Sequence, residues 1–222
     1  MRKAVCLISG GLDSAVAAFV AKSRGFEVHA LSFDYGQRHR KKEISCAKRL
    51  AKTLDAVEHK IIKLDPTVFS GSALTDRRIS VPDTGVSGIP PTYVPARNTI
   101  LLSYALAYAE VIGADAIYIG VNSVDYSGYP DCRPEYIKAF QAMADLATKR
   151  AAEGKPVKIE TPLIDLSKKE IVQLGARLGV PFKHTWSCYR GGKRACGRCD
   201  SCVLRLKGFD EAGTEDPVAY ER

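Results

Sequence analysis

Residues 9–14 read Ser-Gly-Gly-Leu-Asp-Ser, a combination of small, hydroxyl and carboxylate residues that suits the binding of an anion. The apolar run at residues 3–8 predicts a strand before them, and the apolar stretch at residues 15–21 predicts a helix after them. A turn between a strand and a helix directs backbone N–H groups and the positive end of the helix at a phosphate. We therefore predict a phosphate-binding loop at residues 9–14.

Each side chain of this loop has an expected role. Gly10 and Gly11 let the backbone come close to the ligand, while Ser9 and Ser14 add hydroxyl donors. Asp13 is a candidate Mg²⁺ ligand, because this cation prefers carboxylate and water oxygens. The loop lacks the spacing Gly-x-x-x-x-Gly-Lys-Ser/Thr and its phosphate-binding lysine, which disfavours the chemistry of kinases and GTPases.

Four late cysteines form a second group, with the spacing Cys-x₇-Cys-x₂-Cys-x₂-Cys: Cys188, Cys196, Cys199 and Cys202. The two-residue spacings allow neighbouring thiolates to converge on one tetrahedral ion, and Gly197 permits the turn between them. Four sulfur ligands leave no open coordination position, so we expect a structural Zn²⁺ site. An iron–sulfur cluster is the main alternative, and unliganded thiols or disulfides are the other.

The bulk composition agrees with an enzyme that handles anions. The chain has 222 residues and a formal net charge of +8, which favours a partner such as a nucleotide or a nucleic acid. It carries no apolar run of about 18 residues and no secretory pattern, so we expect a cytoplasmic protein without a membrane span. In a reducing compartment, the clustering of four of the seven cysteines favours a metal site over disulfides.

Basic side chains are dense around the late cysteines, where they either face nucleotide phosphates or are solvated at the surface. The seven are Lys183, Arg190, Lys193, Arg194, Arg198, Arg205 and Lys207. Against them stand Asp200 and the negative charge of a Zn(Cys)₄ unit, which leaves a local net charge of about +4.

These groups need a scaffold, and strand and helix patterns alternate along the chain. Strands are expected at residues 3–8, 26–33, 58–64, 116–121 and 158–164, and helices at residues 15–21, 38–54, 98–112, 134–152 and 167–178. Alternation implies right-handed crossovers and an α/β fold with a Rossmann-like open, mostly parallel sheet, which binds ligands at the carboxyl ends of its strands. We expect a nucleotide-binding domain at residues 1–182 and a small zinc-binding region at residues 183–222.

One connection is unusually long. Residues 69–95 are rich in Gly, Pro, Ser and Thr and read as too polar for the core. Long loops in compact domains are usually functional, so we expect this one to lie over the site.

The loop sequence Ser-Gly-Gly-Leu-Asp-Ser resembles the PP-loop of the ATP pyrophosphatase superfamily. The resemblance implies a fold of the adenine nucleotide alpha hydrolase type and cleavage of ATP between the α and β phosphates, with transfer of AMP to a carboxylate or carbonyl oxygen. It implies a nucleotide site formed by Ile8, Ser9, Gly10, Gly11, Leu12, Asp13, Ser14, Ala15, Val16, Ala17 and Ala18.

A PP-loop with four late cysteines resembles, over essentially the whole chain, the 7-cyano-7-deazaguanine synthase family of queuosine biosynthesis. Similar site segments occur at residues 33–39 (Phe-Asp-Tyr-Gly-Gln-Arg-His), 93–98 (Tyr-Val-Pro-Ala-Arg-Asn) and 125–133 (Asp-Tyr-Ser-Gly-Tyr-Pro-Asp-Cys-Arg). The resemblance implies an ATP-dependent carbon–nitrogen ligase that converts 7-carboxy-7-deazaguanine and ammonia to the nitrile preQ0, with ATP, Mg²⁺ and Zn²⁺. It also implies a homodimer and no stable nucleic-acid partner.

Within these segments Asp13 and Arg97 are the predicted catalytic residues, Arg97 because a guanidinium binds phosphate or carboxylate bidentately. Arg97 as an ordinary surface arginine is the competing interpretation. Residues 37–39 are placed near adenosine. Substrate contacts are predicted for Tyr93, Arg97, Asp125, Tyr126 and Asp131, although tyrosines at this spacing are as often packing residues.

The chemistry requires two activations. A carboxylate resists ammonia, so it must first become an acyl-adenylate, which ammonia converts to an amide. Removal of the amide oxygen needs a second activation, and we hypothesise that the same loop adenylates the amide and that loss of AMP leaves the nitrile.

Other functions are also consistent with parts of this pattern. A PP-loop enzyme that modifies a tRNA base would use the basic surface, but it usually needs a redox-active cysteine apart from the metal cluster. A glutamine-dependent synthetase is disfavoured because position 2 is Arg2 and not a nucleophilic cysteine. A zinc-containing binding module on a degenerate nucleotide fold is the non-enzymatic alternative.

Overall fold

The structure is a computed structural model that describes residues 1–84, 88–124 and 128–221. Asp125 and Tyr126, both predicted to bind substrate, lie outside the described residues.

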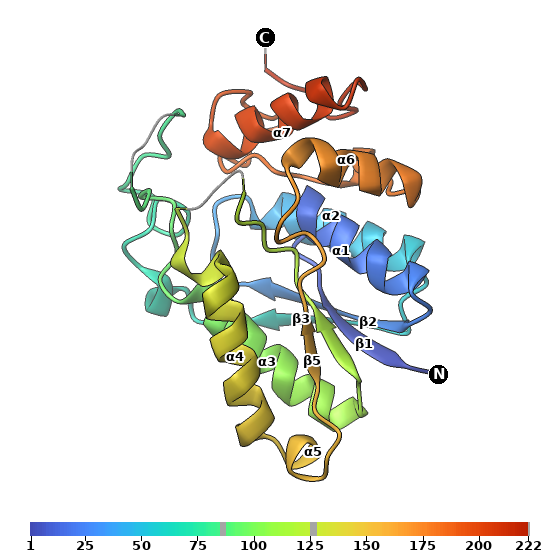
Figure 1. Cartoon of the computed structure of the whole chain (residues 1–222). Coiled ribbons are helices and arrows are strands. Elements are labelled where there is room, and N and C mark those ends of the chain that lie inside the picture. Colours follow the sequence, from blue (N-terminus) through green and yellow to red (C-terminus); the bar gives the residue numbers. More distant parts are fainter. Residues whose placement is uncertain (85–87, 125–127, 222) are drawn as a thin grey trace.

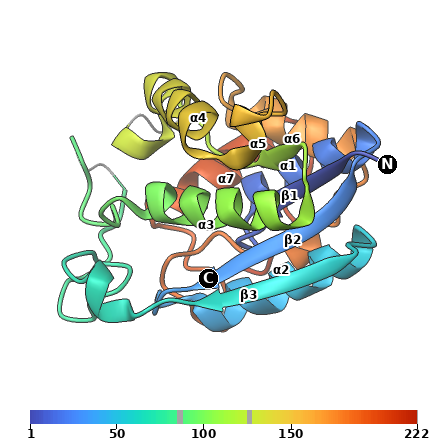
Figure 2. The same ribbon diagram turned by 90° about the horizontal axis from the view of Figure 1, so that it is seen from below.

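The core is a parallel sheet of five strands in the order β3-β2-β1-β4-β5, twisted as Figures 1 and 2 show. The strands are β1 (Lys3–Leu7), β2 (Glu27–Asp34), β3 (Glu58–Lys63), β4 (Ala116–Tyr118) and β5 (Lys158–Glu160). The chain moves outward from β1 to β3 and then returns beside β1 as β4, which places a topological switch point between β1 and β4. The predicted open α/β fold is confirmed, and ligands bind such sheets at the switch point.

Helices cover both faces of the sheet. They are α1 (Leu12–Ser23), α2 (Arg40–Thr53), α3 (Arg97–Ile112), α4 (Pro134–Ala147), α5 (Lys149–Ala152), α6 (Lys168–Arg177) and α7 (Asp200–Glu211), with 3₁₀ turns at Pro66–Phe69, Pro130–Cys132 and Phe182–His184. In Figure 1, α1, α2 and α6 lie on one side with α7 stacked on α6, and α3 and α4 lie on the other. Each side has its own apolar core against the sheet.

The helix ends that matter for the site follow from their sequences. Helix α6 begins with a capping box in which Ser167 and Glu170 each bind the other's backbone N–H, as predicted. Helix α3 ends at Gly113 in the left-handed conformation, also as predicted. The start of α3 has no side-chain cap of its own, because Ala96 precedes it with φ of 50°.

Three predicted elements were wrong in their extent. The helix expected at residues 134–152 is broken, because Thr148 is extended and its hydroxyl caps the separate helix α5 at the N–H of Ala151. Strands β4 and β5 end at Tyr118 and Glu160, before the apolar residues that follow. Those residues continue into the core as irregular chain, so apolar runs overestimated strand length.

The prediction that residues 69–95 are too polar for the core was wrong. Phe69, Leu74, Val81 and Val94 are buried and belong to the core on the α3 side. Scattered apolar residues, spaced irregularly among Gly, Pro and Ser, anchor the segment, and no periodic pattern reveals them.

Arg38 fastens this segment and does not lie with a nucleotide as predicted. Its guanidinium donates to the carbonyls of Ala73, Asp76 and Ile79 at 2.6 to 2.7 Å. The side chain is therefore committed to holding the long loop.

Within the described residues, no helix combines the length and apolarity needed to cross a bilayer. Residues 183–221 pack on α6 through α7, as Figure 1 shows, and the boundary at residue 182 stays a prediction.

Candidate functional site

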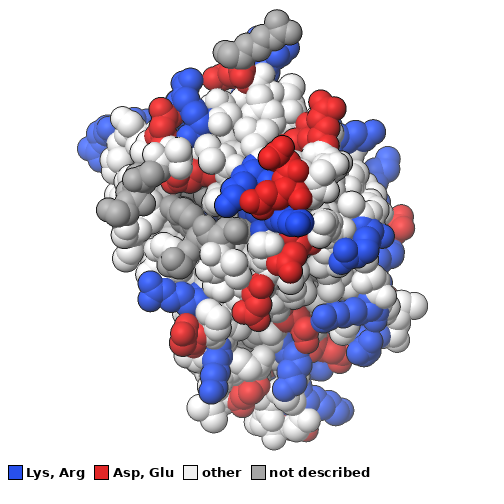
Figure 3. Space-filling view, turned by 45° about the horizontal axis from the view of Figure 1, so that its top comes forward, with Lys and Arg blue, Asp and Glu red and all other residues white. Residues whose placement is uncertain are grey.

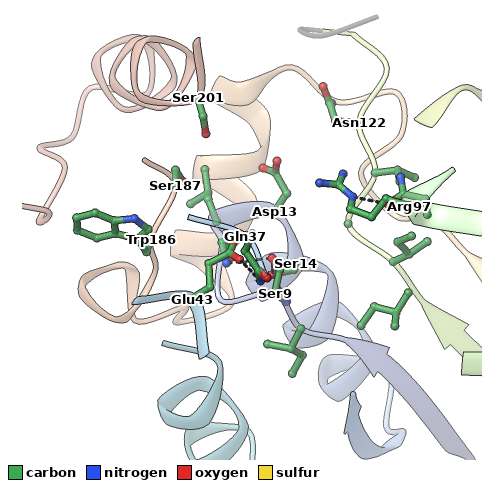
Figure 4. A pocket seen from close by; sticks show the side chains of 18 of the residues that line it. Ser9, Asp13, Ser14, Gln37, Glu43, Arg97, Asn122, Trp186, Ser187 and Ser201 are labelled. Carbon is green, nitrogen blue, oxygen red and sulfur yellow. Dashed lines mark hydrogen bonds between the residues drawn. The ribbon is translucent and has the colours of Figure 1, made fainter. Parts of the chain in front are cut away.

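A cavity of about 260 Å³ lies at the carboxyl ends of β1, β2 and β4, at the switch point of the sheet. Its wall includes the loop after β1, residues 119–122 after β4 and the start of α3. Figure 4 shows Asp13 between Arg97 on one side and Ser187 and Ser201 on the other. The predicted phosphate loop therefore lines a cavity of the fold.

The phosphate loop is held by its own hydroxyls. The Ser9 and Ser14 hydroxyl oxygens are 3.0 Å apart, Ser14 Oγ donates to the Gly11 carbonyl at 3.1 Å, and the Gly11 N–H donates to Ser9 Oγ at 3.2 Å. Gly11 is the N-cap residue of α1 and supplies no side-chain cap. The first N–H groups of α1 are thus left for an anion in the cavity.

Two glycines allow other elements to pack on this loop. Gly10 has φ of 90°, and a Cβ there would lie 2.3 Å from the Glu43 carbonyl oxygen of α2. A Cβ on Gly120 would lie 2.6 Å from the Asp13 carbonyl carbon. Gly10 was predicted to admit the ligand, whereas here it admits α2; Gly120 was missed, because nothing in the local sequence marks a close approach between distant segments.

Asp13 is paired with a lysine that sequence reasoning missed. Lys168 Nζ lies 2.9 Å from each carboxylate oxygen of Asp13, and it also lines the cavity. The two residues are 155 positions apart, and the capping box places Lys168 at the start of α6 without indicating what it faces. The loop lacks a lysine of its own, but the fold provides one beside it.

The entrance to α2 contributes a buried ion pair to the cavity wall. His39 Nε2 lies 3.2 Å from a Glu43 oxygen, and Gln37 Nε2 donates to the other oxygen at 2.9 Å. His39 Nδ1 faces the Tyr189 carbonyl at 3.2 Å, so both ring nitrogens meet acceptors and must carry protons. The wall therefore contains an imidazolium and a carboxylate.

The pKa directions agree with this assignment. Burial alone would lower the pKa of His39, but the charge and hydrogen bond of Glu43 raise it above its ordinary value. Burial alone would raise the pKa of Glu43, and the His39 charge instead holds it below its ordinary value. Gln37 and His39, which were predicted to lie near adenosine, both line the cavity.

Arg97, at the first position of α3, lines the side of the cavity opposite Ser187 and Ser201 (Figure 4). Its Nε donates weakly to Asn98 Oδ1 at 3.4 Å, and the guanidinium also hydrogen-bonds the Tyr35 hydroxyl. The predicted catalytic residues Asp13 and Arg97 are thus brought together on one cavity.

The other described substrate residues take structural positions. Asp131 is buried, its carboxylate accepts the Asn98 N–H at 2.9 Å, and its carbonyl accepts from the Asn98 side chain at 3.0 Å. Tyr93 packs on Tyr129 and accepts the N–H of Ala96 through its hydroxyl at 3.1 Å. Neither Asp131 nor Tyr93 lines the cavity, whereas Tyr129 does.

Part of the predicted nucleotide segment also lies away from the cavity. The lining residues from it are Ile8, Ser9, Gly11, Leu12, Asp13 and Ser14. The following residues, Ala15, Val16, Ala17 and Ala18, are buried in α1 against the sheet. They seat the helix whose first turn faces the cavity.

The four late cysteines converge as predicted. The sulfur atoms of Cys188, Cys196, Cys199 and Cys202 all lie within 4.8 Å of one another, and all four residues are buried. The N–H of Cys196 donates to Cys188 Sγ and that of Cys199 to Cys196 Sγ, both at 3.4 Å. Four converging sulfurs stabilised by N–H donors fit a tetrahedral metal ion.

One basic side chain near the cysteines is not on the surface. Arg205 is 2% exposed and forms a double ion pair with Asp216, so the local positive charge is smaller than predicted. On the face drawn in Figure 3, Lys and Arg side chains stand among Asp and Glu side chains without forming one continuous basic patch. The sequence could not reveal this pair, because α7 and the chain after it must fold back on each other.

Comparison with known proteins agrees with this geometry. The model of the family described as "Queuosine biosynthesis protein QueC" matches residues 3–213, which include the phosphate loop and all four cysteines. The chain belongs to the QueC family.

Relatives within the QueC family are similar over nearly their whole length. The chain is 60% identical over 221 residues to proteins named 7-cyano-7-deazaguanine synthase from Saccharophagus degradans and from Acetivibrio thermocellus. Each alignment covers 99% of this chain and 98% of the relative.

Solved structures share the fold at low identity. A 4-thiouridine synthetase in complex with RNA and bound ATP matches with a TM-score of 0.54 and 20% identity, covering 96% of this chain and 50% of that one. NMN synthetase from Francisella tularensis matches with a TM-score of 0.50 and 19% identity, covering 96% and 78%. At this identity the likeness supports the fold alone.

Proposed function

We propose that this member of the QueC family converts 7-carboxy-7-deazaguanine, ammonia and ATP to 7-cyano-7-deazaguanine. The observation that carries the proposal is the convergence of Asp13, Lys168 and Arg97 around the open N-terminus of α1, in a chain 60% identical to proteins of that name. A carboxylate substrate and a triphosphate are both anions, and this cavity presents cations and N–H groups to them.

We infer a division of labour among these residues. The first-turn N–H groups of α1 and the Lys168 ammonium would hold the pyrophosphate as it leaves. Arg97, on the other side of Asp13, would bind the α-phosphate or the substrate carboxylate bidentately. Adenylation then makes AMP the leaving group that ammonia displaces.

The second activation follows from the same arrangement. The amide oxygen would attack a second ATP in the same cavity, and loss of AMP with the remaining amide proton gives the nitrile. Glu43 and His39 border this cavity as a charged pair, so the elimination would take place next to two charges that the fold holds in place.

Two metals belong to this proposal. Asp13 would hold Mg²⁺, since its carboxylate faces the cavity and already attracts a cation, and Mg²⁺ when bound neutralises phosphate charge. The four cysteines would hold Zn²⁺ as a closed structural site in a region spanning residues 183–222. A homodimer is part of the same proposal.

The decisive assay incubates the purified protein with ATP, Mg²⁺, an ammonium salt and 7-carboxy-7-deazaguanine. We expect AMP, pyrophosphate and a product with the mass of the nitrile, and no product when any one component is omitted. ATP consumption without a deazapurine product would contradict the proposal.

The two-round scheme has its own test. Given the amide and ATP without ammonia, the protein should release one AMP for each nitrile formed. Nitrile formation from the amide without AMP would exclude the second adenylation.

The thiols outside the metal cluster favour this function over tRNA thiolation. Burial raises the pKa of Cys132 to about 11 and raises the pKa values of Cys6 and Cys46 above that of an ordinary thiol. These three residues are therefore protonated at neutral pH and poor nucleophiles. A salt-sensitive gel shift with tRNA would revive the alternative.

A further inference from the structure

Several cavity-lining residues come from the metal-binding segment. Ser187 and Tyr189 flank the ligand Cys188, and Asp200 and Ser201 lie between Cys199 and Cys202. The residues that face the cavity are thus chain neighbours of residues whose sulfurs face the metal site. Each of these residues is directly bonded in the chain to one of the four cysteines. Holding the sulfurs in place therefore also holds this wall of the cavity in place.

The wall is stiffened from behind by a buried arginine. Arg205 Nη1 donates to the hydroxyls of Thr185 at 2.8 Å and Ser187 at 3.3 Å, while its other nitrogens bind Asp216. The Ser187 oxygen accepts from Arg205, so its own proton remains available to a ligand. This places a hydroxyl donor in the cavity on a support that is 2% exposed.

Several other polar side chains around the cavity already have partners within the protein. Asp13 binds Lys168, Glu43 binds His39 and Gln37, and the loop serines bind each other. By contrast, Asp200 and Ser201 are half-buried and make no side-chain hydrogen bond within the described part of the chain. Their side chains can therefore form hydrogen bonds with a ligand.

The cavity is small for the two proposed ligands. About 260 Å³ is below the roughly 300–1,000 Å³ of pockets that enclose one drug-sized ligand, so ATP and the heterocycle would extend along its walls. The cavity is also lined by Leu31, Phe33 and Leu101, which belong to or pack against the apolar core on the α3 side. The metal-binding segment offers hydroxyls and a carboxylate instead.

We propose that the metal-binding segment forms the subsite for the heterocycle, in which Asp200 accepts from the ring N1–H and 2-amino groups and Ser187 and Ser201 bind the ring oxygen. This inference rests on the proposed function. A guanine-like edge presents two adjacent donors beside one acceptor, and a carboxylate with neighbouring hydroxyls complements that pattern. The 7-carboxylate lies beside the ring oxygen on the bicycle, so the phosphate loop and Arg97 would meet it next to the two serine hydroxyls.

The test compares Asp200→Asn and Ser201→Ala with Asp210→Asn, a matched control at an exposed position of the same helix. We expect KM for 7-carboxy-7-deazaguanine to rise roughly 10- to 100-fold in Asp200→Asn, as for loss of a charged hydrogen bond. KM for ATP and the metal content should stay at the wild-type values. Asp210→Asn should leave all of these quantities unchanged.

A second readout separates binding from a structural effect. Trp186 is the single tryptophan and lines the cavity, so its fluorescence can report ligand affinity without turnover. The wild type should bind the analogue that lacks the 2-amino group more weakly than 7-carboxy-7-deazaguanine, and Asp200→Asn should lose this preference. If wild type and Asp200→Asn show the same preference for 7-carboxy-7-deazaguanine over this analogue, the proposed subsite is wrong. If the wild type binds and converts neither compound, the proposed function itself fails.

Discussion

At the scale of single residues, the pairing of Asp13 with Lys168 changes which cations stand beside the phosphate loop. The absence of a lysine in residues 9–14 disfavoured kinase chemistry. In the structure, Lys168 of α6 places its ammonium beside Asp13 of this loop. Because Lys168 comes from a separate element, its ammonium sits beside the first turn of α1 without being part of the loop. In the proposed reaction this ammonium would hold the pyrophosphate as it leaves.

We predict that Lys168→Met lowers the rate of AMP formation roughly 100- to 1,000-fold, the usual effect of removing one group that stabilises transition-state charge. Lys169→Met is the matched control, because Lys169 is adjacent and exposed. Substrate-dependent exchange of labelled pyrophosphate into ATP measures the step directly. Exchange at the wild-type rate in Lys168→Met would rule out contact with the pyrophosphate.

At the scale of elements, helix α3 depends on a residue outside it. Its N-cap position is Ala96, in a left-handed conformation without a capping side chain, and the Asp131 carboxylate supplies the missing acceptor from the following segment. This bond holds the end of α3 from which Arg97 projects. The structure thus gives Asp131 a role that competes with its predicted contact to the substrate.

We predict that Asp131→Ala destabilises the fold by about 1–3 kcal/mol, since it leaves a buried N–H without a partner. Thermal unfolding should show this loss, and Asp131→Asn, which keeps an acceptor, should lose less. A large rise in KM for the heterocycle with unchanged stability would instead support the sequence-based role.

Element boundaries show where sequence reasoning was sufficient. Period and caps placed α2, α3 and α6 closely, because apolar spacing and end residues act within one or two turns. The break at Thr148 and the anchoring of residues 69–95 depend on contacts with the sheet and with Arg38. Those contacts join distant parts of the chain, so local patterns do not contain them.

At the scale of the whole molecule, the cysteine cluster joins α7 to the apolar core on one face of the sheet. Its four cysteines are buried, and the neighbouring Arg205 and Asp216 form an ion pair with side chains only 2% and 3% exposed. Such a pair is costly to disrupt once buried, so the region should unfold as a unit.

We predict that removal of the metal by a chelator lowers the melting temperature by more than roughly 10 °C, because ligand binding to a structural site is also folding free energy. Cys199→Ser should lower both metal content and melting temperature, whereas Cys46→Ser, outside the cluster, should not. Elemental analysis should find one zinc per chain without visible absorption. If the analysis finds iron and the protein absorbs visible light, the cysteines hold an iron–sulfur cluster and the zinc assignment is wrong.

The sequence by itself determined the parts that local chemistry defines. The Ser-Gly-Gly-Leu-Asp-Ser turn, the alternation of strands and helices and the cysteine spacing each act over a few residues, and the structure keeps all three. Only the tertiary structure decided which distant groups meet. Lys168 reaches Asp13, Gly120 admits the loop, and Ser187 and Ser201 face the cavity because parallel strands end at one edge, a relation between elements that no single segment encodes.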